Sequence, residues 1–561
     1  MEQQKVDTLI SEYSILKAKR DNLCLHQWMD IRDYIIPMTG QFKDSDQDGN
    51  NPRDWSNILD NTAGRSARVL VAGMQGGLTS PSRPWFKIGH QDSMLIQNQE
   101  VKSFLHEVEK RMYAVFSASN FYSSVNMVYR EEMGYGPAVM LMFEDDEATV
   151  RFYTLTAGEY CLSQDNRRKV NGLYRTIYLD ATQLAKKFGK ANLPKDVREQ
   201  LDKDGRGNPF KVHPVAHIIR NRDFYNPKMI DAINMPFSST YILEDEKKII
   251  IESGFREWPL AAPRWSLTGS DPYGNGACSE VLGDVKGLQE VTYDKLQALS
   301  IMIRPPLKAP SNLKGEIGNL DAGDVVYGDR ADIDKFEPIM DITPNLAQFN
   351  QDIGDMRQQI RQGLYNDLFL SLMEKTGQMT ATEIAERHEE KLLLLGDVIE
   401  RQFTDLLNPT IDRVFAIMLR KGMIPKIPQI LIDSISEGSN SIGLKVEFVS
   451  LLAQAQKLVT TQSIRAVTGY ALELAVAVPN VLDNVNFDEA ITEYSESVSS
   501  PPNLVRSKED VAKIREARQI QEAKDRQIQE EQIAVENAQK LGATSTEEGT
   551  ALSELKQTMG G

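Results

Sequence analysis

The segment Ser279–Ile303, SEVLGDVKGLQEVTYDKLQALSIMI, decides how the rest of the chain is interpreted. Its apolar residues recur at roughly helical spacing and are Val281, Leu282, Val285, Leu288, Val291, Leu296, Leu299 and Met302. Arg304-Pro305-Pro306 ends the predicted helix, because proline lacks the amide donor and restricts the residue before it. The pattern predicts a helix that stops abruptly.

After this helix the chain makes an excursion and comes back. Residues 307–345 are rich in Gly and Asp and hold short β-type pieces such as Asp324–Tyr327. A second helical run covers Leu346–Leu364, and a short connection at Phe369–Met379 leads to a long predicted helix, Thr380–Lys421. A small β-rich insert carried on two helices predicts a protrusion that stands off a main body.

The long predicted helix has clear start and stop signals. Thr380-Ala381-Thr382-Glu383 has the pattern of a capping box, and Arg420-Lys421-Gly422 is a typical C-terminal ending. Pro409 predicts a kink near Asn408. One face is apolar and contains Ile384, Leu392, Leu395, Ile399, Phe403 and Leu406. A long core helix in a large α+β protein is the alternative interpretation of this pattern.

Composition limits the class of protein. With 561 residues the chain is too long for one simple core, so two or more subdomains are expected. The start of the chain is polar and acidic, which predicts no signal peptide, and no apolar stretch approaches the ~20 residues that cross a bilayer. Cys24, Cys161 and Cys278 lie too far apart for a disulfide framework or a zinc spacing, which favours a reducing cytoplasm.

The formal net charge is −16. Proteins that grip nucleic acid through its phosphates need clustered Lys and Arg, so the charge argues against tight binding of nucleic acid. It is compatible with a protein past which nucleic acid slides without sticking. Taken alone, the charge favours the simpler interpretation of an ordinary acidic soluble protein.

The rest of the chain predicts an α+β block followed by helices. The predicted helices are Val6–Ile36, one from about Asn61 to Gly77, Glu100–Ser117, Phe121–Glu132, Thr182–Phe188, much of Val446–Val478, and Ser507–Lys540. The predicted strands are Ala138–Phe143, Val150–Thr154, Glu159–Leu162, Leu173–Leu179, Lys211–Arg220 and Lys248–Phe255. Met235–Tyr241 is apolar and turn-like, and residues 542–561 have a composition typical of disorder.

A search for chemistry finds no convincing active site. Gly73-Met74-Gln75-Gly76-Gly77 lacks the lysine of a phosphate-binding loop. His213 and His217 are separated by Pro214, and no Glu completes a zinc helix. Glu144-Asp145-Asp146-Glu147 could bind a divalent cation, although its place between strands favours a solvated hairpin turn. No catalytic residue, metal or cofactor is expected.

Several motifs together resemble the head-to-tail connector, or portal, proteins of short-tailed, T7-like bacteriophages. The run Asn61–Phe86 carries the resemblance most clearly, through Gly76, Gly77, Ser80, Pro81, Arg83, Pro84 and Trp85. The other motifs are Trp28-x-x-Ile31-x-x-Tyr34-x-x-Pro37, Pro263-Arg264-Trp265, Tyr273-Gly274 and Met379–Ile384. Each motif is weak alone, but together they span most of the chain.

The resemblance implies an α+β, mainly helical portal fold that assembles as a ring, dodecameric in the family. The implied parts are a wing (1–275), a stem helix (276–303), a clip (304–345), a returning stem helix (346–364), a tunnel loop (365–379), the long helix with the rest of the wing (380–500), a crown helix (501–541) and a disordered tail (542–561).

The resemblance also implies a function as the conduit for genome packaging and ejection at one capsid vertex. DNA-channel candidates on the tunnel loop are Met373, Glu374, Lys375, Thr376 and Gln378, and adaptor-binding candidates on the clip are Lys314, Glu316, Asp321 and Asp324. The implied partners are further copies of the chain, double-stranded DNA without sequence specificity, major capsid and scaffolding proteins, a terminase large subunit, a tail adaptor, and internal core or ejection proteins. The implied location is the portal vertex of the virion, after assembly in the host cytoplasm.

Two other functions remain open at this point. Another head–tail ring component, such as a tail adaptor, would use the same surroundings, but adaptors are usually much shorter and lack an element like Thr380–Lys421. A metal-dependent nuclease would use the acidic turn, with Asp145 and Asp146 as its ligands.

Overall fold

The computed structural model of the protein describes residues 2–42, 55–90, 95, 98–201, 208–226, 228–229, 231–303, 307–308, 337–338, 346–374, 395–436, 444–449, 467–475, 480, 484–491 and 508–544. These residues divide into two compact units. The first contains Met1–Gly89 and Phe104–Gln462, and the second contains His90–Ser103 and Ser463–Gly561. Each unit is described by itself.

A five-stranded antiparallel sheet lies in the first unit, in the order β4-β5-β6-β7-β8. Its strands are β4 (Tyr160–Gln164), β5 (Val170–Asp180), β6 (Val212–Asn221), β7 (Phe237–Leu243) and β8 (Lys248–Phe255). Neighbouring residues of β6 point to opposite faces of the sheet. Helices pack on both faces, so buried side chains lie on each side. Val215 packs on one side against α7 (Ala181–Phe188) and α8 (Lys195–Gln200), whereas Ile218 packs on the other against α1 (Glu2–Arg20).

A smaller sheet in the same unit has the order β3-β2-β9. It consists of β2 (Val139–Asp145), β3 (Thr149–Leu155) and the short β9 (Leu260–Ala261). β2 and β3 form a hairpin in which Val139 lies opposite Leu155. The first four residues of β2 are completely buried, so the hairpin is part of the core. The mixture of helices and sheets confirms the predicted α+β class.

The N-terminal helix is present but interrupted. A π-helical turn, η1 (Asp21–Leu25), separates α1 from α2 (His26–Tyr34). Trp28 of α2 is only 1% exposed and its Nε1 donates a hydrogen bond of 2.9 Å to the carbonyl oxygen of Tyr135. Its ring packs edge-on against Tyr135 and Tyr273. Trp28 therefore ties the N-terminal helix to two later parts of the body.

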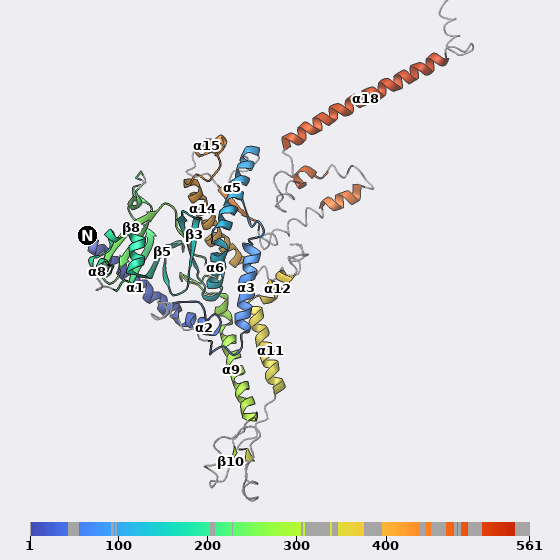
Figure 1. Ribbon diagram of the computed structural model, residues 1–561. Helices are drawn as coiled ribbons and strands as arrows, with labels where there is room; N and C mark the ends of the chain where they lie inside the picture. The colour runs from blue at the N-terminus through green and yellow to red at the C-terminus, as the bar shows by residue number, and fades with distance from the viewer. Residues whose placement is uncertain are drawn as a thin grey trace, which may run out of the picture. The chain divides into compact units, whose positions relative to one another are not determined.

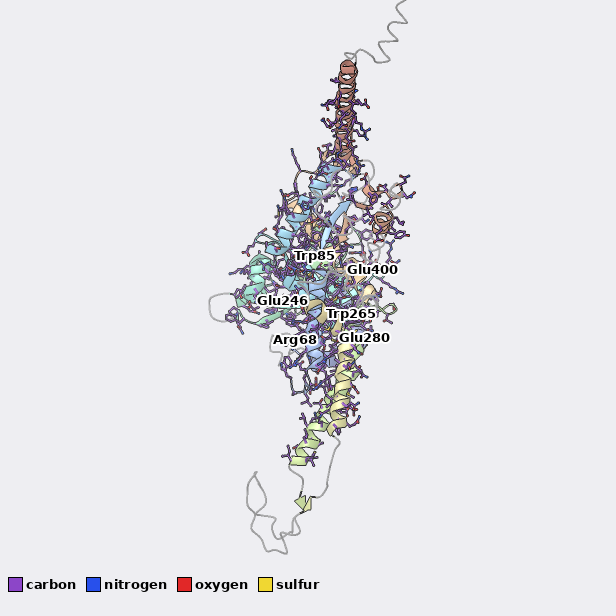
Figure 2. The ribbon with its side chains drawn as sticks, turned by 90° about the vertical axis from the view of Figure 1, so that its right-hand side faces the viewer. Arg68, Trp85, Glu246, Trp265, Glu280 and Glu400 are labelled. Atoms are coloured by element: carbon purple, nitrogen blue, oxygen red, sulfur yellow. The ribbon has the colours of Figure 1, made fainter. Side chains whose placement is uncertain are left out.

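Two long helices project from this body. α9 (Ala277–Ile303) and α11 (Leu346–Gly363) lie side by side and extend past α2 and α3 (Thr62–Leu78), as both views show (Figures 1 and 2). They pack closely, because a Cβ added at Gly363 would lie 2.4 Å from Cγ1 of Val281. Beyond them, β10 (Leu307–Lys308) and β11 (Glu337–Pro338) pair antiparallel. The predicted helix and returning helix are thus confirmed, whereas the insert between them, with the β-type piece Asp324–Tyr327, lies outside the described residues except for β10 and β11.

The predicted helices α3, α5 (Gln99–Ala118) and α6 (Phe121–Tyr135) are also confirmed. α18 (Lys508–Thr544) confirms the predicted final helix as one continuous element of the second unit, within which Arg515 pairs with Asp488 at 2.7 Å. In the part of the chain that the structure describes, no helix is both long and apolar enough to cross a membrane.

The predicted helix Thr380–Lys421 needs correction. Its first part lies outside the described residues, which resume as helix at residues 395–401. A π-helical segment, η6 (Gln402–Leu407), then precedes α14 (Asn408–Arg420). Pro409 stands in the first turn of α14. The wider π turn lies where the ring of this proline would clash with the preceding turn of an α-helix.

Three other predictions were wrong in whole or in part, and in the two that concern strands long-range pairing outweighed the local pattern. Met235–Tyr241 was predicted to be turn-like, but β7 lies between β6 and β8, which supply hydrogen bonds on both sides. The predicted helical region Val446–Val478 is helical at residues 467–475 but begins with β12 (Leu444–Phe448), which pairs with β1 (Phe86–His90), and the residues between lie outside the described ones. The predicted loop at 365–379 is helical from Asn366 to Glu374, as α12.

Removing the Trp28 side chain should destabilise the body strongly. We expect Trp28→Ala to lower the free energy of unfolding by ~3–5 kcal/mol, because a large buried side chain leaves a cavity. Trp28→Phe keeps most of the ring contacts and loses the hydrogen bond to Tyr135, so its cost should be smaller. Urea unfolding followed by circular dichroism measures both. Equal stability of Trp28→Ala and the wild type would contradict this role.

Candidate functional site

Asp60 lies at the base of the two projecting helices and contacts both of them, α11 through its carboxylate and α9 through its backbone. Asp60, just before α3, accepts hydrogen bonds from the amide of Thr62 at 2.8 Å and from Nε of Arg357 on α11 at 2.7 Å. Burial opposes ionisation of Asp60, but the hydrogen bonds from Thr62 and the Arg357 guanidinium outweigh it, so the pKa of Asp60 lies below its usual value. Asp60 therefore joins the start of α3 to α11.

Gln289 of α9 binds the same segment from the other side. Its Oε1 accepts hydrogen bonds of 2.8 Å from the amides of Leu59 and Asp60, and its Nε2 donates one of 2.8 Å to the carbonyl oxygen of Asp60. Gln289 is 5% exposed. A single turn of backbone thus holds both projecting helices. The sequence pattern did not indicate this link, since Asp60, Gln289 and Arg357 are far apart in the chain.

A second close approach joins α3 to α12. A Cβ added at Gly73 would lie 2.1 Å from Cδ1 of Phe369, whose side chain is fully buried. Only glycine fits at this position without movement of the aromatic ring. Phe369, which the sequence placed on a loop, is therefore an anchor for the segment that follows α11.

Trp85, the last residue of the sequence fingerprint, is part of the aromatic core of the first unit. Trp85 is 1% exposed and stacks on Phe121, with ring centroids 5.8 Å apart. The hydroxyl of Tyr113 accepts hydrogen bonds from the amides of Trp85 and Phe86 and donates one to the carbonyl oxygen of Phe86. Trp85 lies inside the body of the first unit (Figure 2).

The rest of the fingerprint divides between core and surface. Gly77 is buried and Ser80 half-buried, whereas four members lie at the surface: Gly76, Pro81, Arg83 and Pro84. The hydroxyl groups of Ser80 and Ser82 are 3.1 Å apart and form a hydrogen bond in the turn after α3. The fingerprint therefore shapes the path from α3 to β1.

The predicted channel and adaptor residues are mostly not placed. Met373 and Glu374 are the last two residues of α12, whereas Lys375, Thr376 and Gln378 lie outside the described residues. The four clip candidates Lys314, Glu316, Asp321 and Asp324 also lie outside them. The β10–β11 pair nevertheless brings the two ends of the insert together.

The acidic hairpin turn between β2 and β3 binds basic side chains. Glu144 pairs with Arg420 of α14 at 2.6 Å, and Asp145 pairs with Arg151 at 3.1 Å. The Ala148 amide, followed by the Arg151 guanidinium, holds the pKa of Asp145 below its usual value. Arg420 also reaches Glu257 at 2.6 Å. These carboxylates fasten the end of α14 to the hairpin.

The described residues contain no group of three or more His, Cys, Asp or Glu side chains that could hold a metal ion. Cys24, Cys161 and Cys278 are free and buried, and burial raises the pKa of each thiol, to about 12, 11 and 12. His213 and His217 lie on β6, as expected for strand residues, and His217 stacks on Tyr241.

Two adjacent carboxyl groups of α6 are buried in the body. Burial raises the pKa of Glu131 to about 7 against hydrogen bonds from the Ala157 amide and the Thr156 hydroxyl. Burial raises the pKa of Glu132 to about 8, while a hydrogen bond from Nε2 of Gln402 opposes the shift. Gln402 belongs to the π-helical segment η6. This pair therefore joins the element that ends at Arg420 to the centre of the body.

A proton on Glu132 completes this contact. Among the described residues, Glu132 Oε2 and Gln402 Oε1 have no hydrogen-bond partner, and both are acceptors when Glu132 is ionised. A neutral carboxyl group carries a donor that the ionised form lacks, and burial of Glu132 favours this form, which agrees with the raised pKa.

Comparison with known proteins finds one matching family model and two relatives that align with the whole length of the chain. A family model described as "Bacteriophage head to tail connecting protein" matches residues 6–505. The chain is 36% identical over 568 aligned positions to a "probable portal protein" of Bordetella phage BPP-1, covering 100% of this chain and 99% of that relative. It is 34% identical over 565 positions to the "portal protein" of Salmonella phage epsilon15, with the same coverage of 100% and 99%.

The contact between Gly73 and Phe369 can be tested with a matched pair of substitutions. Gly73→Ala should lower the free energy of unfolding by ~1–3 kcal/mol, because the added methyl group collides with the ring. Gly76→Ala in the same helix has nothing within 4 Å and should raise it by ~0.5–1 kcal/mol. Thermal unfolding measures both, and Phe369→Leu should relieve part of the cost of Gly73→Ala. The same effect from both alanines would refute the close approach.

Glu132 predicts a pH dependence of stability. Its folded pKa is about 8 against an ordinary 4.5, so the stabilisation by the neutral form is complete below pH ~4.5 and is lost as the pH rises through 8. In the wild type the free energy of unfolding should fall by up to ~1.4 kcal/mol per pH unit between pH 5 and 8 because of Glu132. We expect Glu132→Gln to remove this fall. Urea unfolding at several pH values measures the slope. Glu199→Gln, at an exposed site, serves as the control, and equal slopes for all three proteins would contradict the assignment.

Proposed function

The chain belongs to the bacteriophage head to tail connecting proteins, and we propose that this portal protein works as a closed dodecameric ring at one vertex of the capsid. In this proposal the ring is the conduit for packaging and ejection of the genome and the docking site for the tail adaptor. The subunit number follows the resemblance. The projecting pair α9–α11, held at its base by Asp60, is the observation that carries the proposal.

The parts of the ring follow from this pair. α9 and α11 are the stem, and the insert whose ends are paired by β10 and β11 is the clip, which meets the adaptor through Lys314, Glu316, Asp321 and Asp324. The two sheets with α1–α8 make the wing, α18 is the crown helix, and residues 365–379 are the tunnel segment.

The proposed channel lets DNA pass without holding it. Its candidates at the bore are Met373, Glu374, Lys375, Thr376 and Gln378, of which Lys375 supplies a weak contact to phosphate. The exposed residues of α11 include the neutral amides of Gln351, Gln358, Gln359 and Gln362 together with two acidic and two basic residues, Asp352, Asp355, Arg357 and Arg361. Together with a net charge of −16, such a surface gives DNA few cations to bind.

The connector role implies contacts with the capsid and the tail. We propose the major capsid and scaffolding proteins, a transient terminase large subunit, the tail adaptor and internal core or ejection proteins as partners. The site of action is the portal vertex of the virion, reached after assembly in the host cytoplasm. In this proposal a separate packaging ATPase, the terminase large subunit, moves the DNA. The ring itself is a passive conduit and performs no catalysis.

The two alternatives have less support. A tail adaptor would match neither the family model nor the full-length portal relatives. A nuclease would need the carboxylates of the acidic turn for metal ions, whereas Glu144 and Asp145 are paired with Arg420 and Arg151. These ion pairs give the turn a structural role.

Ring formation tests the proposal. We expect the purified chain to give closed rings with a central hole in negative-stain microscopy, and a mass in solution of many subunits. Because the five proposed channel residues include one cation, Lys375, binding of linear duplex DNA should be weak and should vanish as salt is raised. A monomer or dimer with metal-dependent cleavage of DNA would overturn the proposal, and loss of that activity in Asp145→Ala with Asp146→Ala would place it at the acidic turn.

A further inference from the structure

The contact between Glu132 and Gln402 has an unused half. Nε2 of Gln402 donates to Oε1 of Glu132, whereas Glu132 Oε2 and Gln402 Oε1 have no hydrogen-bond partner among the described residues. Both side chains are completely buried. A carboxylic acid and an amide can pair through two hydrogen bonds, in which the O–H of the acid donates to the amide oxygen. Such a pair exists only while Glu132 carries its proton.

Arg401 lies next to this pair in the chain and is bound to a carboxylate at the surface. Its Nη2 pairs with Asp397, which stands four residues earlier in the same helical run and has a side chain that is 78% exposed. The Arg401 side chain is only 20% exposed, and its Nε is buried without a partner among the described residues. The guanidinium therefore binds a solvated carboxylate and keeps an unused N–H inside the body.

Arg401 is close enough to Glu132 for its charge to act on the carboxyl group. Burial raises the pKa of Glu132, while the hydrogen bond from Gln402 and the positive charge of Arg401 oppose the shift. Neighbouring residues of a helix point ~100° apart, so one carboxyl group can be reached from two consecutive side chains. Arg401 is the residue at which the π-helical segment η6 begins. Glu132 thus faces an amide and a cation from adjacent positions.

The other ionisable groups around Glu132 are engaged elsewhere. Asp405 of η6 disfavours ionisation of Glu132 and lies 3.5 Å from Arg264. On α6 itself the neighbours are Tyr129 and Glu131, whose side chains have hydrogen bonds of their own. The buried residues of α3, β2 and β3 include no ionisable side chain. The groups that reach α6 from α2 and α9 act on Tyr135 instead, and are Arg32 and Cys278.

We propose that Arg401 changes partner when Glu132 loses its proton, so that it leaves Asp397 at the surface and pairs through Nε with the Glu132 carboxylate inside the body. With the proton present, Glu132 pairs with Gln402 and Arg401 stays with Asp397. Without the proton, the buried negative charge needs a cation, because an unpaired charge inside a protein is costly. A single proton then decides whether the turn at residues 397–402 is fastened to the surface carboxylate or to α6.

The direction of the pH dependence follows from the neutral state of Glu132. In the folded chain the carboxyl group is half ionised near pH 8, so the exchange should take place as the pH rises through this value. Loss of the competing carboxylate of Asp397 frees Arg401 and should make ionisation easier. Loss of Arg401 itself should make it harder. A purely structural role of either residue changes the stability of the chain and leaves this midpoint where it is.

Hydrogen exchange of the full-length chain tests the exchange of partners. Mass spectrometry between pH 6 and 10, corrected for the intrinsic exchange rates, follows the amides of residues 395–407. We expect a change in protection with a midpoint near pH 8 in the wild type and none in Glu132→Gln. Asp397→Asn should lower the midpoint by ~0.3 pH unit, the size of an exposed pair four residues apart. Arg401→Gln should raise it by ~1 pH unit, a tenfold change in proton affinity.

Two further variants serve as controls. Glu107→Gln breaks the same kind of pair on α5, where Glu107 and Arg111 stand four residues apart, and should keep the wild-type midpoint. Arg401→Lys keeps the charge, so its midpoint should lie closer to that of the wild type than the midpoint of Arg401→Gln.

Three results would overturn the proposal. The first is a wild type without a midpoint between pH 6 and 10, and the second is a midpoint that persists in Glu132→Gln, because another group would then titrate. The third is a midpoint in Asp397→Asn or Arg401→Gln that equals that of the wild type, because Arg401 would then not change partner. None of these measurements depends on whether the chain forms a ring, so the proposed function and this inference stand or fall separately.

Discussion

The hydrogen-bonded link of Asp60 with Gln289 and Arg357 is the constraint on which the projecting part of the molecule depends. A two-helix pair cannot bury enough apolar surface to keep a fixed direction by itself. Here the backbone at Asp60 exchanges hydrogen bonds with Gln289 of α9, while the Asp60 carboxylate accepts hydrogen bonds from Arg357 of α11 and from the Thr62 amide at the start of α3. The direction of α9 and α11 is therefore set by the body of the protein. A component that must present its tip to another structure needs such a fixed base.

The body obtains its rigidity from contacts between segments that are far apart in sequence. Trp28 joins the N-terminal helix to Tyr135 and Tyr273, and Phe369 closes against the bare backbone of Gly73. Buried polar contacts do the same for the last long element. Glu132 holds Gln402 in the π-helical segment, and Arg420 binds Glu144 and Glu257 at the other end of α14. Both ends of the element are thereby tied to the α6–β2–β3 region.

Several groups that could take part in chemistry are engaged in structural contacts among the described residues. Glu144 and Asp145 of the acidic turn form ion pairs with Arg420 and Arg151. The three cysteine thiols are buried, which raises the pKa of each and disfavours the reactive thiolate. The most distinctive feature of the first unit is its projecting pair of helices (Figure 1). The body carries two helices, of which α9 exposes Tyr293, Leu296 and Ile303 and α11 exposes the amides of Gln358 and Gln362.

Sequence by itself determined the elements whose signals are local. The apolar period of Ser279–Ile303, the Pro305-Pro306 stop and the returning run Leu346–Leu364 were sufficient to predict the projecting pair, and scattered motifs identified the family. Only the tertiary structure decided β7, β12 and α12, because their residues take the conformation that neighbouring strands or Gly73 impose. It also decided that Asp60, Gln289 and Arg357 meet, and that Tyr293, Leu296 and Ile303 stay uncovered. The physical reason is that periodicity reports which face of a helix is apolar, whereas what covers that face depends on residues hundreds of positions away.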